Sequence, residues 1–237
     1  MILGQPLIEV FKGSIVMLIL LVCSIIALAL IIERFLYFLR NGFDTRTGFL
    51  KFSQVLRSQG TNAALNFAAQ KKNPLFGLFT IALQNQHLDA DSLYDVLSSY
   101  VIEEKLKFDR YLGGMGTLAN AATLLGLLGT VTGLIRAFHN IAITGSGGPA
   151  VISAGIAEAL LTTAFGLFIG IPTLFFYNYY TKKSNELAMA LDGVTDKIIV
   201  VLENMKKKQE KSAPATAPTP PPQPAVMPQV EDTAWKF

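Results

Sequence analysis

The residue with the clearest chemical potential in this sequence is Glu158, the only acidic residue between Arg136 and Lys182. The positions that follow it are apolar or small, as in a membrane span, where an acidic side chain costs several kcal/mol unless it is paired, protonated or facing water. A carboxyl in such a place is a candidate functional group. The alternative is a carboxyl that merely reaches the outer headgroups from the first turns of its helix.

Three hydroxyls accompany this carboxyl. On a helical wheel, Thr130 falls on a face of small residues in one apolar run, and Thr162 and Thr163 fall on the same narrow arc as Glu158 in the next run. Counted from the outer ends of the two runs, Thr130 and Glu158 should be level, with Thr162 and Thr163 one turn deeper and no basic residue beside the carboxyl. Hydroxyls donate and accept hydrogen bonds and a carboxyl can load and release a proton, so this set predicts a proton pathway.

Glycines share the two faces with these residues. Small faces allow two membrane helices to approach closely, and simple helix packing is the alternative function for them. Because one chain is too thin to enclose a pore, such faces must close against copies of the chain or against a partner, and we expect a ring. The expected packing residues are Gly126, Gly129, Gly133, Gly155, Gly166 and Gly170.

The elements that must position these residues are spanning helices. The chain of 237 residues is 51% hydrophobic and only 16% charged, against about 25% charged in soluble domains. No charged residue occurs in 13–32, 111–135 or 159–181, and each stretch reaches the roughly 20 residues that cross a bilayer core. The sequence therefore predicts an all-α integral membrane protein with three transmembrane helices, whose long helices extend into a helical domain.

Basic residues predict the orientation of these helices. Of the 20 lysines and arginines, 10 lie in residues 33–112 and 8 lie after Tyr180, whereas the connection between the second and third spans has none. By the positive-inside rule, the large loop and the C-terminus are cytoplasmic, and the N-terminus and the short connection are periplasmic. The predicted segments are an interfacial lead-in (1–12), the first span (13–32), a cytoplasmic helical domain (33–110), the second span (111–138), a periplasmic loop (139–149), the third span (150–180), a cytoplasmic helical extension (181–210) and a proline-rich, disordered tail (211–237).

Within residues 33–110, polar residues and breakers mark the expected helix ends. Asp44 and either Asp89 or Asp91 are expected N-caps, and Gly60 and Asn73-Pro74 are expected breaks. The amphipathic segment 92–111 is expected to run straight into the second span. Its charged cluster, residues 103–107, is expected to be a solvated face.

Several classes of function are excluded by the composition. A net charge of +3 without a basic stripe argues against nucleic acid. The single cysteine, Cys23, lies in the first apolar run, so neither an internal disulfide nor a thiolate metal cluster is expected. The chain shows no nucleophile–base pair, metal-ligand spacing or phosphate loop, so we expect no enzyme and no cofactor.

Two strings in the apolar runs resemble a known family. Residues 126–138, GLLGTVTGLIRAF, and 154–178, AGIAEALLTTAFGLFIGIPTLFFYN, are similar to the signature segments of the MotA/TolQ/ExbB proton-channel family. Three expected spans favour the ExbB/TolQ branch, because MotA-type members have four. The resemblance implies a pentamer in the bacterial inner membrane around the single span of an ExbD/TolR-like partner, whose aspartate takes the proton. It matches Thr130, Thr163 and Glu158 to pore residues.

The function expected from this resemblance is that of a stator subunit coupling the proton motive force to outer-membrane work. An ExbB-like protein would energise TonB-dependent transport, with a TonB-like protein as a further partner. A TolQ-like protein for envelope maintenance is one alternative, and a non-conducting membrane scaffold is another.

Overall fold

The computed structural model describes residues 15–144 and 149–212, and all the regular secondary structure in this part of the chain is helical. The expected lead-in at 1–12, most of the proline-rich tail and the central part of the periplasmic loop lie outside this part of the chain. The described helices are α2 (Ile15–Asn41), α3 (Thr45–Ala69), α4 (Pro74–Gln84), α5 (Ala90–Asp109), α6 (Leu112–Thr144) and α7 (Pro149–Ser212).

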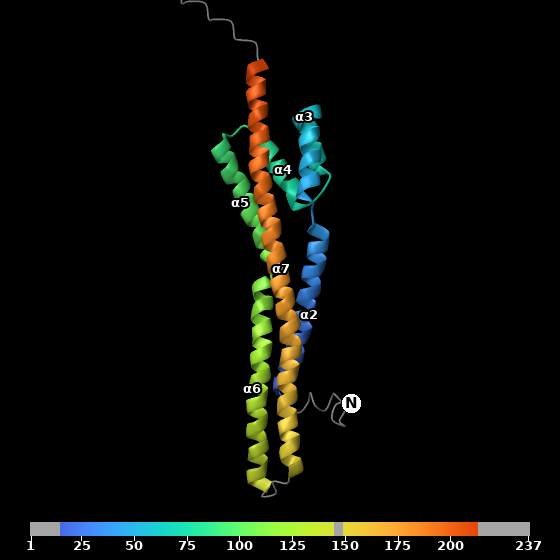
Figure 1. The fold of residues 1–237 in the computed structure, drawn as a ribbon, viewed down its shortest axis with the longest axis vertical. Coiled ribbons are helices and arrows are strands. Elements are labelled where there is room, and N and C mark those ends of the chain that lie inside the picture. Colours follow the sequence, from blue (N-terminus) through green and yellow to red (C-terminus); the bar gives the residue numbers. More distant parts are fainter. Residues whose placement is uncertain (1–14, 145–148, 213–237) are drawn as a thin grey trace, which may run out of the picture.

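The longest helix, α7, runs the length of the molecule and contacts every other described helix to some extent (Figure 1). In one half of the molecule, α6 packs along α7 and α2 lies against both of them. In the other half, α3, α4 and α5 gather around the C-terminal part of α7. The end of α6 at Thr144 and the start of α7 at Pro149 lie at the opposite end of the molecule from α3–α5 (Figure 1). Residues 45–109 and the C-terminal part of α7 therefore lie on the same side of the apolar helices.

Three helices are long and apolar enough to cross a membrane: α2, α6 and α7. Their outer surfaces carry large exposed apolar side chains, such as Ile25, Leu127 and Phe168. Exposed leucine, isoleucine and phenylalanine are costly in water but suit lipid or subunit contacts. The chain is thus a multi-pass membrane protein, as its sequence predicts.

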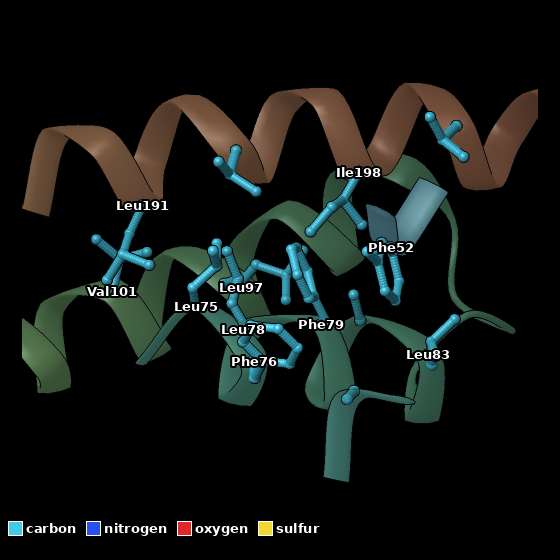
Figure 2. Close-up of a cluster of buried hydrophobic side chains, with 14 of the residues drawn as sticks. Phe52, Leu75, Phe76, Leu78, Phe79, Leu83, Leu97, Val101, Leu191 and Ile198 are labelled. Atoms are coloured by element: carbon cyan, nitrogen blue, oxygen red, sulfur yellow. The ribbon is translucent and has the colours of Figure 1, made fainter. Parts of the chain in front are cut away.

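The helical domain, which we define as α3–α5 with the part of α7 from Ser184 onward, has its own core. Phe52 and Phe79 stack with ring centroids 4.1 Å apart. Figure 2 shows Leu191 and Ile198 pointing from α7 toward the side chains of α4 and α5. This apolar packing fixes the domain on α7, so the domain and the third spanning helix form one body.

Capping residues define the helices of this domain. The carboxylates of Asp44 and Asp89 and the amide oxygen of Asn73 accept backbone N–H groups in the first turns of α3, α5 and α4. Asp89, and not Asp91, is the cap of α5. Hydrogen bonding to Thr47 lowers the pKa of Asp44, and hydrogen bonding to Ser92 lowers that of Asp89. Gly60 interrupts α3 with a φ of 83°, a left-handed conformation that favours glycine.

The junction between α5 and α6 differs from its prediction. The amphipathic segment does not run straight into the second span, because α5 ends at Asp109 and α6 begins at Leu112. Between them Arg110 has a ψ of 132° and Tyr111 has a φ of 65°. A left-handed φ is uncommon for a bulky residue, so tertiary contacts must maintain it.

The charged cluster on α5 was also predicted wrongly in one respect. Glu104 is not part of a solvated face, because only 6% of it is exposed. Its carboxylate lies 2.6 Å from Nζ of Lys107. Burial and the nearby Glu104 carboxylate raise the pKa of Tyr100, whose hydroxyl donates to the carbonyl of Pro74. This buried polar cluster joins α4 to α5 at the membrane-proximal end of the domain.

Candidate functional site

The small faces of α6 and α7 pack against each other within one chain. A Cβ added at Gly126 would lie 3.1 Å from Cα of Gly166, and one added at Gly166 would lie 2.5 Å from the carbonyl oxygen of Ala122. The two backbones are therefore in contact, which only glycine at these positions allows. All six glycines expected to pack face the opposite helix: Gly126, Gly129, Gly133, Gly155, Gly166 and Gly170.

Two of the expected hydroxyls meet at this contact. Thr130 of α6 and Thr163 of α7 share a hydrogen bond through their Oγ1 atoms. Thr163 also lies 2.9 Å from the carbonyl oxygen of Gly126, whereas Thr130 lies 3.4 Å from it. Each hydroxyl has only one hydrogen to donate. Because Thr163 lies closer to the carbonyl of Gly126, the hydroxyl of Thr163 donates to that carbonyl, and the hydroxyl of Thr130 donates to the oxygen of Thr163. The remaining lone pairs of this half-buried pair can accept further hydrogen bonds.

Thr162 has a different environment from these two residues. It is 2% exposed, and its methyl carbon occupies the space in front of Gly129, 2.1 Å from where a Cβ would lie. Its hydroxyl donates to the carbonyl of Glu158 at 2.9 Å, one turn earlier in α7. The side chain of Thr162 thus fills the contact between α6 and α7 within one chain, and its role in lining a pathway stays a prediction.

The alignment of the two helices is shifted by about one turn from its prediction. Thr130 is level with Thr163, and not with Glu158. The prediction ended the second span at residue 138, but α6 continues to Thr144 before the connection to Pro149. Because α6 ends later in the sequence than predicted, each residue of α7 lies opposite a later residue of α6 than predicted. Glu158 consequently lies about 7.5 Å farther out than the hydroxyl pair, at 1.5 Å per residue.

This shift brings a basic residue to Glu158. Nη1 of Arg136 lies 3.7 Å from Oε1 of Glu158, so the expectation that no lysine or arginine neutralises the carboxyl is wrong. The side chains of Arg136 and Glu158 are 49% and 39% exposed. An ion pair is the usual way in which a charge is accommodated inside a span. Arg136 is thus a residue of the site that sequence reasoning missed, because a second span ending at residue 138 put Arg136 near its outer end, away from Glu158.

These residues form a site with two levels. The outer level is the Arg136–Glu158 ion pair, and the inner level is the pair of hydroxyls on the carbonyl of Gly126. Both levels lie where α6 and α7 meet, on opposite sides of the tightly packed Thr162. The outer level can bind or release a proton, and the inner level can exchange hydrogen bonds with a group that passes it.

The region that contains this site is similar in sequence to known proteins. Residues 70–193, which include both levels, match the MotA/TolQ/ExbB proton channel family. The chain is 33% identical over 173 residues to a protein named biopolymer transport protein ExbB-like 1 from Synechocystis sp., a match that covers 69% of this chain and 65% of that protein. It is 34% identical over 100 residues to the biopolymer transport protein ExbB of Neisseria gonorrhoeae, which covers 42% of this chain and 46% of that one.

An archaeal relative is also similar. The biopolymer transport protein ExbB homolog of Methanothermobacter thermautotrophicus is 28% identical over 149 residues, which is 63% of this chain and 50% of the relative. The chain thus spans between about half and two thirds of the length of these curated relatives. Since the family match covers more than half of the sequence, including the site, this chain belongs to the MotA/TolQ/ExbB proton channel family, and the relatives named here support its ExbB-like branch.

Proposed function

We propose that this chain is the channel-forming subunit of an ExbB-like motor in the bacterial inner membrane, where it converts the proton motive force into work at the outer membrane. In this proposal five copies enclose the single span of an ExbD/TolR-like partner. The partner's membrane aspartate carries the proton, and a TonB-like protein receives the movement. The observation that carries the proposal is the two-level site on a contact whose other residues are mostly small.

The geometry supports a defined order of events. A proton that enters from the periplasmic side first meets Glu158, whose carboxylate and Arg136 partner are both partly exposed. The partner's aspartate then takes up the proton and passes the hydroxyls of Thr130 and Thr163. The hydrogens of both hydroxyls are already donated within the chain, so the hydroxyl oxygens can only accept further hydrogen bonds. They therefore favour a protonated carboxyl, which can donate, over a carboxylate, which can only accept.

The available energy suits this mechanism. One elementary charge crossing about 100 mV releases about 2.3 kcal/mol, which exceeds the free energy of one hydrogen bond of about 1 kcal/mol. A few protons per step therefore suffice to exchange the contacts of a packed helix. Neutralising the aspartate also removes the cost of moving a charge along an apolar wall.

One observation favours the scaffold alternative. Thr162 and all six glycines of the small faces are used in packing α6 on α7, as they would be in a membrane protein that never conducts. The pore-facing role then rests on Thr130, Thr163 and Glu158 alone, because these three side chains are only partly buried.

Proton flux separates the two functions. The chain and an ExbD-like partner would be reconstituted in liposomes with a potassium-diffusion potential, and internal acidification would be followed with a pH-sensitive dye. A motor subunit gives a partner-dependent flux that disappears when the partner's aspartate is changed to asparagine. A scaffold gives the same trace as liposomes without protein.

A further inference from the structure

The buried cation Arg34 lies outside the proposed pathway. It follows the apolar run of α2, yet it is 1% exposed. Burying a guanidinium is costly unless its donors are bonded and its charge is balanced. Such a residue therefore needs a specific reason to occupy its position.

The contacts of Arg34 answer this requirement. Its Nη1 atom donates to two backbone carbonyls of α5, that of Lys107 at 3.2 Å and that of Phe108 at 3.1 Å. Nε and Nη2 donate to the carboxylate of Glu33, which balances the charge. The guanidinium also lies 4.4 Å from the ring centroid of Tyr37 and 5.5 Å from that of Tyr111.

These contacts lie at the joint between α5 and α6. Lys107 and Phe108 belong to the last turn of α5, where carbonyls have no amide partner within the helix. The next residues are Arg110 and Tyr111, whose backbone changes the direction of the chain. Arg34 thus satisfies the carbonyls that the break exposes, and its positive charge is favourable at the negative end of the α5 dipole.

A second contact fixes the same joint from α7. The hydroxyl of Ser184, which is fully buried, donates to Oδ1 of Asp109, the last residue of α5. The joint is therefore bonded to α2 through Arg34 and to α7 through Ser184. With both bonds in place, α6 cannot turn at the joint without moving the helical domain.

We propose that Arg34 is a positioning residue that transmits movement between the spanning helix α6 and the helical domain. This inference rests on the proposed function, because it assigns a role in coupling and not in conduction. A guanidinium suits the role because its planar fork of donors bridges two carbonyls and a carboxylate at once, whereas a lysine ammonium is a point charge on a flexible stem. Without this bridge, the exposed carbonyls would bond water and the joint would become a hinge.

The test compares Arg34→Gln and Arg34→Lys with Arg40→Gln in the full chain with its ExbD-like partner. Arg40 lies on the same helix but is exposed, so its substitution controls for a lost positive charge near the membrane. Four properties are measured: pentamer yield, liposome proton flux, amide hydrogen exchange of residues 110–116, and uptake of a labelled nutrient through a TonB-dependent transporter in cells lacking their own ExbB.

For Arg34→Gln we expect a normal pentamer yield, a flux within about twofold of wild type, at least tenfold faster exchange at the joint, and at least a tenfold loss of uptake. Arg34→Lys should recover part of the uptake, and Arg40→Gln should behave as wild type. A parallel loss of pentamer, flux and uptake would make Arg34 a folding residue only and would overturn the proposal, as would normal uptake in Arg34→Gln. Absence of flux from the wild-type complex would instead overturn the proposed function itself, and the coupling role with it.

Discussion

Thr130 and Thr163 face each other across the contact of α6 and α7, and their hydroxyls form a hydrogen bond above the carbonyl of Gly126. Replacing both by valine keeps the shape of the side chains and removes the hydroxyls. We expect Thr130→Val, Thr163→Val to assemble and to lose about tenfold or more of the proton flux, since one hydrogen bond of about 1 to 1.5 kcal/mol corresponds to roughly that factor. Thr130→Ser with Thr163→Ser retains the hydroxyls and is the control. Normal flux in the double valine variant would remove this pair from the pathway.

Glu158 and Arg136 allow the acid to be tested apart from its ion pair. Glu158→Gln cannot ionise and should lower the flux at least tenfold, whereas Glu158→Asp should keep a part of it. Arg136→Gln removes the same ion pair but leaves the acid, whose side chain is 39% exposed and can be accommodated in a span by facing water. We therefore expect Arg136→Gln to assemble and to keep more than about half of the flux. If Gln at 158 conducts as well as Glu while Ala fails, the side chain only packs and hydrogen-bonds.

The glycine contact between α6 and α7 predicts a large difference between two Gly→Ala substitutions in α7. In Gly166→Ala the new methyl would lie 2.5 Å from the carbonyl oxygen of Ala122, and backbone cannot move aside cheaply. We expect a loss of about 1 to 3 kcal/mol, measured as a lower midpoint of thermal unfolding in detergent. At Gly193 nothing lies within 4 Å of the added methyl, so Gly193→Ala should be neutral or gain up to about 1 kcal/mol. Equal effects at the two sites would contradict the close packing.

Gly77 and Tyr100 form a second close contact, inside the helical domain. A Cβ at Gly77 would lie 2.2 Å from the hydroxyl oxygen of Tyr100. Gly77→Ala should therefore destabilise the domain, and adding Tyr100→Phe should relieve the clash although it removes the hydrogen bond to Pro74. We expect the two substitutions to be coupled by about 0.5 to 3 kcal/mol in a double-mutant cycle of chemical unfolding. Simple additivity would show that the tyrosine moves away freely.

The orientation in the membrane is predicted from the basic residues and is open to direct measurement. In a background without Cys23, Gly145→Cys should react with an impermeant thiol reagent in intact cells. Ser212→Cys should react only after the membrane is opened, because the end of α7 is expected in the cytoplasm. Labelling of position 212 in intact cells would reverse the topology.

Local signals in the sequence predicted the local structure well. Asp44, Asp89 and Asn73 cap helices because short polar side chains bond the free amides of a first turn, an interaction that needs no tertiary contact. The faces of the apolar runs were likewise predictable, because the helical period alone determines them.

The alignment of the two helices was not predictable in this way. Residues 139–144 carry no charge and no glycine or proline, so nothing in the sequence showed that α6 continues to Thr144. This error in alignment then separated Arg136 from Glu158 in the prediction. The break at Tyr111 also lacks a glycine or proline, and the side chain that bonds its carbonyls comes from residue 34, more than 70 positions away.

The great length of α7, which continues through Pro172 to Ser212, gives the molecule a mechanical property. From Lys182 to Ser212 the helix extends about 45 Å beyond its apolar part, at 1.5 Å per residue. A tilt of about 5° within the membrane would displace its far tip by about 4 Å, nearly the 5.4 Å pitch of a helix. The helical domain is packed on this lever near its base and middle. A small rearrangement at the level of Thr163 need not separate α6 from α7. Through the length of α7 it would still become a displacement of several ångströms at the far tip, which a neighbouring protein could sense.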